Sequence, residues 1–255
     1  MSPHLTELIL PVAMAVAAGL VGAFALMRRM ALASDALSHV ALPGIGIALA
    51  LRLNPVLGGL AALFVGVVLV WAIERKTLLP TEAIIGVIFS AALAIGSMLT
   101  SGEDLIEALF GASRAPGTAE AMLGLITAAA VSAFIVRARN RLVITLISPD
   151  LAATAGVNVE RLNLAFLLAF AFAIALGLRY LGVLLMGSLL IIPAATAKHL
   201  AGSLTSMLLI SVGFAVGSTI AGAVLAPIVH VEVGAAVIVI AAAAFFVSLP
   251  LRRPA

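Results

Sequence analysis

The sequence predicts an all-α, polytopic integral membrane protein with about nine transmembrane helices, and three observations support this class. Of the 255 residues, 64% are hydrophobic and only 10% are charged, whereas a soluble domain carries roughly 25% charged residues. Mean hydropathy is +1.30, and the apolar residues form long continuous runs. Such runs lack the alternation that a membrane β-barrel requires. We therefore interpret residues 1–255 as a single transmembrane domain.

The apolar runs define the predicted spans in chain order. They cover residues 6–27, 31–51, 55–73, 82–100, 119–136, 162–178, 181–197, 203–227 and 232–250, each near the roughly 20 residues that cross a bilayer. Residues 162–197 admit a different division, which leaves eight spans as an alternative. The N-terminal residues MSPHLTELIL contain no positively charged region, so we expect the first run to be a retained span and not a cleaved signal peptide.

The basic residues predict the orientation of these spans. With nine crossings and the N-terminus outside, the inner segments hold 11 of the 14 Lys and Arg residues and the outer segments hold three: Arg52, Arg114 and Arg179. This bias matches the positive-inside rule and puts the C-terminus in the cytoplasm. The sequence pI of about 10.2 therefore reflects membrane topology, and we expect no nucleic-acid partner. The expected location is the cell inner membrane.

Two ionisable residues, Asp35 and His39, lie four positions apart inside the second predicted span. Residues at this spacing share one face of a helix. A rise of 1.5 Å per residue places His39 near the bilayer centre. An aspartate at that depth costs roughly 2.5–3.5 kcal/mol on insertion scales. The pair therefore requires a compensating partner.

Three explanations for this pair remain open on spacing alone. The pair can be an interhelical hydrogen-bonded contact, a proton relay of the kind found in transporters, or a divalent metal site. Carboxylate and imidazole ligands suit zinc, manganese and iron, and the absence of cysteine excludes thiolate ligands. Two ligands are too few for a closed structural site, but they suit an ion that has to leave again.

Pro43, Gly44 and Gly46 follow this pair directly. Proline removes a backbone donor and bends a helix, and glycine lets another backbone come close. A bent helix with ionisable residues is typical of the interrupted helices that line transport sites.

A short cytoplasmic helix is predicted in the connection that runs from Arg137 to about Arg161. Ser148, Pro149 and Asp150 are a helix start signal, and Gly156 is a stop signal. This helix is either a connector or a docking element for a cytoplasmic partner.

The segment SDALSHVALPG (residues 34–44) resembles a segment of the permease subunits of bacterial ABC importers for zinc, manganese and iron, which reads approximately GDALSHAVLPG. Further blocks resemble the same family in the same order. They are TEAIIGVIFSAALAIG (81–96), EDLIEALFG (103–111), SPDLAATAGVNVERLN (148–163) and LGVLLMGSLLIIPAATAKHLAGSL (181–204). Ser34 replaces a common glycine and Glu82 replaces a frequent aspartate, and neither departure touches the proposed ligands.

The resemblance implies a fold like that of type II ABC importers. It implies a homodimer of permeases in the lipid membrane, a separate ABC ATPase and an extracytoplasmic metal-binding protein. Asp35 and His39 are the implied metal ligands, and the metal is the cargo, so no cofactor is expected. The segment implied to contact the ATPase contains Pro149, Asp150, Ala152, Ala153, Ala155 and Gly156. The chain has no phosphate-binding loop of the form G-x-x-x-x-G-K-[ST], so we expect it to be a transporter permease and not an enzyme.

His230 and Glu232 lie at the outer end between the last two predicted spans. A regular helix does not place residues two apart on one face, but an extended turn does. They are candidates for completing the metal site or receiving the ion at its mouth, and a solvated loop is an equal alternative.

Other functions compete with a metal-ion ABC permease. A proton-coupled or facilitative metal carrier also needs an intramembrane site, but the predicted helix at 148–156 argues against it. An ABC permease for a siderophore or cobalamin-like ligand does not need Asp35 and His39 on one face. An intramembrane enzyme is disfavoured because Ser38 and His39 are adjacent, and adjacent helical residues point apart. The sequence leaves the choice among zinc, manganese and iron open.

Overall fold

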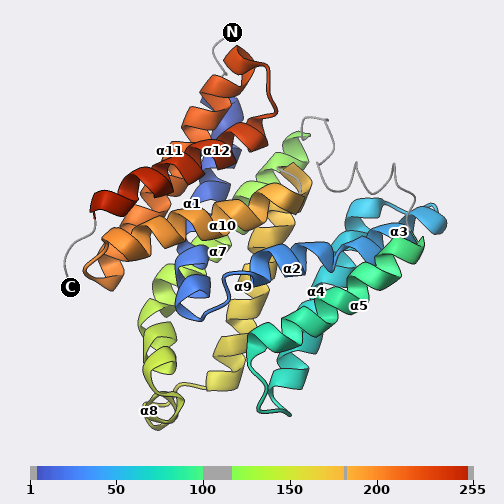
Figure 1. Ribbon diagram of the computed structural model, residues 1–255. Helices are drawn as coiled ribbons and strands as arrows, with labels where there is room; N and C mark the ends of the chain where they lie inside the picture. Colours follow the sequence, from blue (N-terminus) through green and yellow to red (C-terminus); the bar gives the residue numbers. More distant parts are fainter. Residues whose placement is uncertain (1–4, 100–116, 181–182, 252–255) are drawn as a thin grey trace.

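The computed structural model describes residues 5–99, 117–180 and 183–251, and all regular structure within these ranges is helical (Figure 1). The helices are α1 (Leu5–Met27), α2 (Ala33–His39), α3 (Leu42–Ala50), α4 (Pro55–Glu74), α5 (Thr81–Leu99), α7 (Thr118–Ile147), α8 (Pro149–Thr154), α9 (Val159–Tyr180), α10 (Val183–Leu200), α11 (Leu204–Val229), α12 (Val233–Ser248) and the 3₁₀ turn η1 (Leu249–Leu251). The all-α fold class is confirmed. The motif at 103–111 lies outside the described residues.

Within the described ranges, seven helical stretches are long and apolar enough to cross a membrane. One of them is Ala33–Ala50, which consists of α2 and α3 together. Helix α12 occupies the last predicted span but has only 16 residues, fewer than this requirement asks for. A multi-pass membrane protein is therefore supported, and the count of nine spans is approximate.

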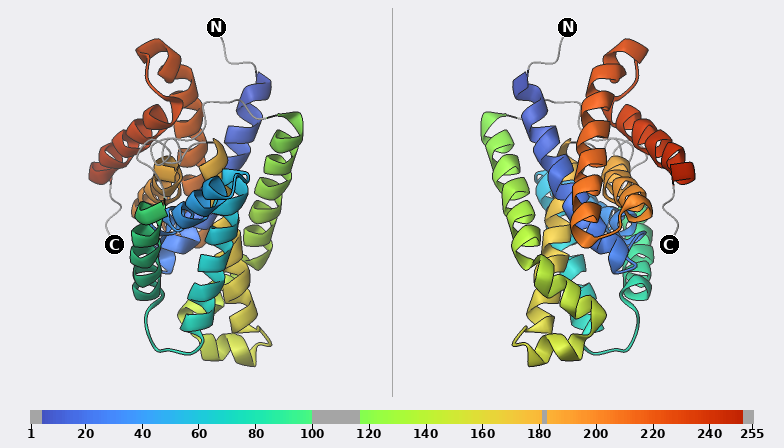
Figure 2. Two further views of the ribbon diagram at one scale, coloured as in Figure 1. Left: turned by 90° about the vertical axis from the view of Figure 1, so that its right-hand side faces the viewer. Right: turned by 90° about the vertical axis from the view of Figure 1, so that its left-hand side faces the viewer.

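Helix α1 lies at the centre of one half of the molecule, between α7 and α11 in both views of Figure 2. Its residues Met14 and Phe24 are completely buried. Small residues permit the close packing, since a Cβ atom added at Gly22 would lie 1.9 Å from the carbonyl oxygen of Leu190 in α10. Close backbone approach at small residues is the usual way for helices to associate in lipid.

Helices α3, α4 and α5 form a second group beside this one, and α2 packs against α5, α9 and α10 (Figure 1). The α3–α4 contact depends on glycine, because a Cβ atom added at Gly44 would lie 2.1 Å from the carbonyl oxygen of Gly58. Helix α2 thus connects the two groups of helices, and it carries Asp35 and His39.

The predicted interruption near Pro43 is present, because α2 ends at His39 and α3 begins at Leu42. Proline has no N–H group to donate to the carbonyl four residues earlier. Between the two helices, the amides of Val40 and Ala41 bond three residues back, to the carbonyl oxygens of Leu37 and Ser38.

Helix α7 differs from the sequence-based prediction. The span was expected at 119–136, with a connection from Arg137, but the helix continues to Ile147. The residues from Arg137 to Ile147 contain no proline or glycine, and a helix that leaves a membrane continues into water when nothing terminates it. The basic cluster is therefore part of a rigid helix that leads directly to α8.

Candidate functional site

Asp35 and His39 lie on one face of α2, as the spacing predicts. Nε2 of His39 is 4.0 Å from Oδ1 of Asp35. This distance is too long for a hydrogen bond, but one ion with bonds of about 2.0–2.2 Å to each ligand can span it. The Asp35 side chain is 55% exposed, whereas that of His39 is 16% exposed. The carboxylate is thus accessible from outside this chain.

Two buried serines of α2 make hydrogen bonds, one to α10 and one within α2 itself. The hydroxyl of Ser34 donates to the carbonyl oxygen of Gly187 in α10, at 3.4 Å, and the hydroxyl of Ser38 donates to the carbonyl of Ser34, at 2.6 Å. A Cβ atom at Gly187 would lie 3.4 Å from the Asp35 backbone, so α10 runs close beneath the aspartate. Because the Ser38 hydroxyl is bonded within its own helix, the pair of Ser38 and His39 does not form a nucleophile and base.

The imidazole ring of His39 is oriented by packing. It lies against the ring of Phe89 in α5, with 5.7 Å between the centroids. Nε2 is the ring nitrogen that faces Asp35, and Nδ1 is buried without a hydrogen-bond partner in the described structure. A histidine that binds a metal usually donates its second N–H to an acceptor. Here the ring contact with Phe89 supplies the orientation instead.

His230 and Glu232 lie at the junction of α11 and α12. His230 ends α11 in a left-handed conformation with φ 57°, and both residues are exposed. Figures 1 and 2 place this junction at the same end of the molecule as the start of α1, whereas α2 lies in the middle. Across the described ranges, no group of three or more His, Asp or Glu side chains could hold a metal ion. The structure therefore does not bring these two residues into one cluster with Asp35 and His39.

The predicted short helix is present as α8 and has the predicted ends. The Ser148 side chain accepts from the amide of Leu151 at 3.3 Å, Pro149 is the first helical residue, and Gly156 adopts φ 78°. Ala152 is fully buried against its own chain. The other predicted contact residues of this segment are exposed: Pro149, Asp150, Ala153, Ala155 and Gly156.

Two apolar residues beside them were not predicted. Leu151 in α8 is 58% exposed, and Ile147, the last residue of α7, is 76% exposed. Figure 1 shows α8 at one end of the molecule. Exposed apolar side chains that lie together mark a surface that contacts a protein or a membrane.

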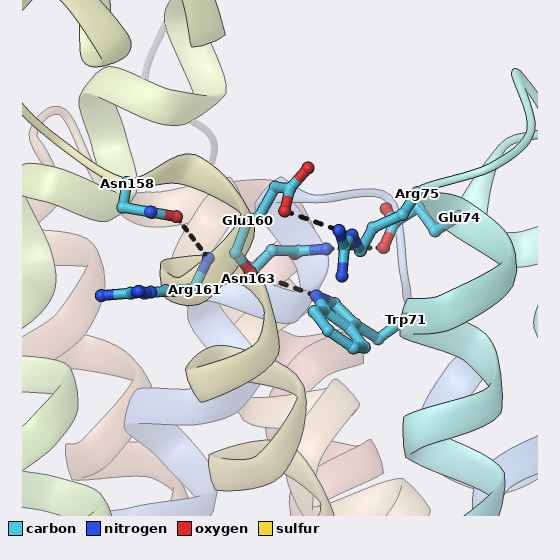
Figure 3. Close-up of polar contacts among 7 residues, drawn as sticks. All are labelled: Trp71, Glu74, Arg75, Asn158, Glu160, Arg161 and Asn163. Atoms are coloured by element: carbon cyan, nitrogen blue, oxygen red, sulfur yellow. Dashed lines mark hydrogen bonds and ion pairs between the residues drawn. The ribbon is translucent and has the colours of Figure 1, made fainter.

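A polar network that the sequence analysis missed lies next to α8. Asn163 in α9 accepts a hydrogen bond from Nη1 of Arg28, and its amide nitrogen donates to Glu74 at 2.5 Å. The other carboxylate oxygen of Glu74 accepts from the hydroxyl of Thr81 at 2.6 Å. Figure 3 shows Asn163 directed at Glu74 across the gap between α9 and α4.

A second set of contacts lies beside this network and is more exposed. Nε of Arg75 is 3.2 Å from Oε2 of Glu160, and the two side chains are 44% and 60% exposed. The guanidinium group of Arg75 also lies over the ring of Trp71, whose Nε1 donates to the carbonyl of Glu160 at 3.2 Å (Figure 3). These contacts connect the same two helices, α4 and α9.

Arg28 is a cation in a poorly hydrated position just beyond the spanning part of α1. Burial lowers its pKa to about 10, and the nearby Glu74 carboxylate opposes this shift. The guanidinium group lies 4.2 Å from the ring centre of Phe166. The side chain remains charged at neutral pH, and its buried Nε atom has no partner within the described residues.

Both sets of contacts line a cavity of about 360 Å³ that reaches α8. Its walls include Arg28, Glu74, Pro149, Glu160 and Asn163. The helix predicted to contact a partner and the polar network therefore share one cavity.

Comparisons with known proteins agree with these features. The model of the "ABC 3 transport family" matches residues 5–252. The chain is 28% identical over 245 residues to the manganese transport system membrane protein MntC of Listeria monocytogenes, covering 94% of this chain and 88% of the relative. It is 30% identical over 239 residues to the high-affinity zinc uptake system membrane protein ZnuB of Haemophilus influenzae, covering 91% of each.

A solved structure is also similar. The fold matches a chain in the structure of PsaBC from Streptococcus pneumoniae in complex with Fab, with a TM-score of 0.79 and 28% identity. The match covers 95% of this chain and 89% of that one. The similarity thus extends over nearly the whole length in both sequence and structure.

Proposed function

Because the chain belongs to the ABC 3 transport family, we propose that it carries a divalent transition-metal ion, zinc or manganese and also iron as a candidate, into the cytoplasm. The chain is a multi-pass membrane permease and not an enzyme, and ATP hydrolysis belongs to a separate subunit. The names of the relatives, a manganese system protein and a zinc system protein, support this class of cargo.

The observation that carries the proposal is the 4.0 Å separation of His39 Nε2 and Asp35 Oδ1 on an interrupted helix. Nitrogen and oxygen donors suit these metals. Among the described residues neither atom is occupied by a hydrogen bond, and α2 is tied to α10 by the Ser34 hydroxyl instead. The donors are therefore free for an ion while the backbone that carries them is fixed.

A homodimer completes the proposed site. One chain supplies two ligands, whereas zinc usually binds four in a closed site and three in an open one. The Asp35 carboxylate is 55% exposed and accessible from outside the chain. A second copy across a shared axis would bring the number of ligands to four.

The partners of the permease follow from the two ends of the molecule. We assign the end with α8, the basic part of α7 and the connection after α4 to the cytoplasm and to the ATPase. The opposite end, with the start of α1 and the α11–α12 junction, faces the extracytoplasmic metal-binding protein, so the N-terminus is outside. With nine spans, the C-terminus is then cytoplasmic. Apolar side chains exposed on α4, α5 and α7, including Leu57, Val87 and Ile126, face lipid or a second copy.

The test is metal uptake into vesicles that contain the permease with its cognate ATPase and binding protein. We expect ATP-dependent uptake of Zn²⁺ or Mn²⁺ by the complex, and its loss when Asp35 is changed to Asn. Uptake of none of the three metals, or uptake that does not require ATP, would reject the proposal. Uptake driven by a pH gradient without ATP would favour a proton-coupled carrier.

A further inference from the structure

We propose that Arg28, Asn163 and Glu74 form a bridge that positions the Asp35–His39 pair and transmits movement of α8 to it. This inference rests on the proposed function, because it assigns the bridge a role in coupling the ATPase to the metal site. We call these three residues the Arg28 bridge.

The bridge connects helix ends that are distant in sequence. Arg28 follows the last residue of α1, Glu74 is the last residue of α4, and Asn163 lies in the first turns of α9. Asn163 is the central member, because its amide group accepts from Arg28 and donates to Glu74. Glu74 extends the connection to α5 through Thr81. Four helices are thus held together at one point.

The turn between Arg28 and α2 is stiff. The amide of Met30 donates to the carbonyl of Ala25 at 2.8 Å, and the amide of Ala33 donates to the carbonyl of Met30 at 3.1 Å. Met30 is 2% exposed, and Arg29 adopts a left-handed conformation with φ 62°. A turn with this bonding absorbs little displacement. Movement of Arg28 is therefore carried to Asp35, which is the third residue of α2.

The other end of the bridge is connected to α8. Four residues, 155–158, separate Thr154 at the end of α8 from Val159 at the start of α9. This connection is closed by hydrogen bonds from the Val157 amide to the Ala152 carbonyl at 2.9 Å, and from the Arg161 amide to the Asn158 side chain at 2.9 Å. A partner that displaces α8 therefore also displaces the first turns of α9.

A second cation site in the same cavity is the alternative role for these residues, and the contacts disfavour it. Both carboxylates of the cavity are already neutralised. Glu74 has Arg28 as its neighbouring cation and is bonded through Asn163, while Glu160 pairs with Arg75. With each negative charge matched by a guanidinium group, a divalent cation gains little attraction here.

The chain offers a matched control within the same cavity. The Arg75–Glu160 pair also connects α4 to α9, but it is largely exposed, and exposed ion pairs contribute little. Among the described residues, no hydrogen bond or ion pair joins it to the turn before α2. Glu160→Gln should therefore leave coupling unchanged, whereas Asn163→Leu should abolish it.

The experiment uses the complex with the cognate ATPase and a single cysteine as a reporter. The chain has no cysteine of its own, so Ala36→Cys places a unique thiol on α2 beside Asp35. The rate of its modification by N-ethylmaleimide is measured without nucleotide and with ATP bound. We expect the two rates to differ several-fold in the otherwise wild-type and Glu160→Gln permeases, and to become equal in the Asn163→Leu permease.

A folding defect is separated from a coupling defect by a combined variant. Removing one member leaves an uncompensated charge or amide, whereas replacing all partners of a buried network by apolar residues is often tolerated. In the variant with Arg28→Leu, Asn163→Leu and Glu74→Leu, we expect thermal stability close to that of the wild type and still no ATP-dependent change in labelling. Recovery of that change in the combined variant would mean that the bridge only supports folding and would overturn the proposal.

The labelling measurement involves no metal, so its result does not depend on which metal the complex transports. If the wild-type complex imports none of the three metals, the proposed function fails while the labelling comparison still tests the bridge. If the thiol at position 36 reacts at the same rate with and without ATP in the wild-type complex, the bridge proposal fails whatever metal is transported.

Discussion

Nε2 of His39 lies 4.0 Å from Oδ1 of Asp35, one helical turn away, and no hydrogen bond joins the two side chains. The imidazole ring packs against Phe89, and the α2 backbone is tied to α10 by the Ser34 hydroxyl. The contacts that orient the two side chains therefore do not use the donor atoms. Such an arrangement suits a site that binds an ion and releases it again.

The first prediction concerns these two ligands. Asp35→Asn and His39→Ala should each abolish metal uptake, because each removes one of the two donors that the chain supplies. Membrane insertion and assembly with the ATPase should be unchanged, since neither side chain makes a hydrogen bond to another described residue. The measurement is uptake of radioactive metal into vesicles, with Ala36→Cys as the neighbouring control. Normal metal uptake by both variants would reject the metal site and favour the alternative that the pair serves only helix packing.

The second prediction concerns topology. Reporter fusions after Arg75 and Arg253 should be cytoplasmic, and a fusion near Ala115 should be external, because the nine-span arrangement puts 11 of the 14 basic residues on one side. A pair of reporters, one active only outside and one only inside, checks each position. A cytoplasmic result at Ala115 would contradict the arrangement of spans.

The third prediction distinguishes two neighbouring alanines in α8. Ala153 is exposed and Ala152 is completely buried. Ala153→Arg should leave the permease folded but weaken its contact with the ATPase, seen as loss of co-purification or of the stimulation of ATP hydrolysis by the metal-loaded binding protein. Wild-type assembly, hydrolysis and uptake in this variant would show that α8 is only a connector.

Ala152→Arg serves as the contrast for that experiment. It inserts a long charged side chain into the contact between α8 and its own chain, so the permease itself should be destabilised. Thermal unfolding in detergent separates the two outcomes, because only the buried substitution should lower the unfolding temperature.

The fourth prediction concerns the contact between α1 and α10. Gly22→Ala should destabilise the protein by about 1–3 kcal/mol, as overpacking of a core does, because the added Cβ atom would lie 1.9 Å from the Leu190 carbonyl oxygen. Gly213→Ala in α11 is the matched control, since nothing lies within 4 Å of the added atom. Its stability should be unchanged or raised, because alanine is favoured over glycine in helices by roughly 1 kcal/mol. Equal unfolding temperatures for the two variants would contradict this packing.

The sequence alone predicted the features that depend on neighbouring residues. The helical class, the shared face of Asp35 and His39, the interruption before Pro43 and the ends of α8 all follow from helix periodicity and capping. These effects act over one or two turns, so the residues that cause them lie within a few positions of each other. The predicted end of α7 was wrong, because a change from apolar to basic residues ends the part of a helix that lies in a membrane but does not end the helix.

Only the tertiary structure decided which distant residues meet. Arg28 and Asn163 are 135 positions apart, and Asn163 and Glu74 are 89 apart. Each alone resembles an ordinary polar residue at a helix end. Their bonding, the burial of Ala152 beside an exposed Ala153, and the closeness of Gly22 to Leu190 depend on how the helices pack. Helix packing is set by the summed contacts of whole faces, whereas periodicity, capping and charge bias can be read from short segments of the chain.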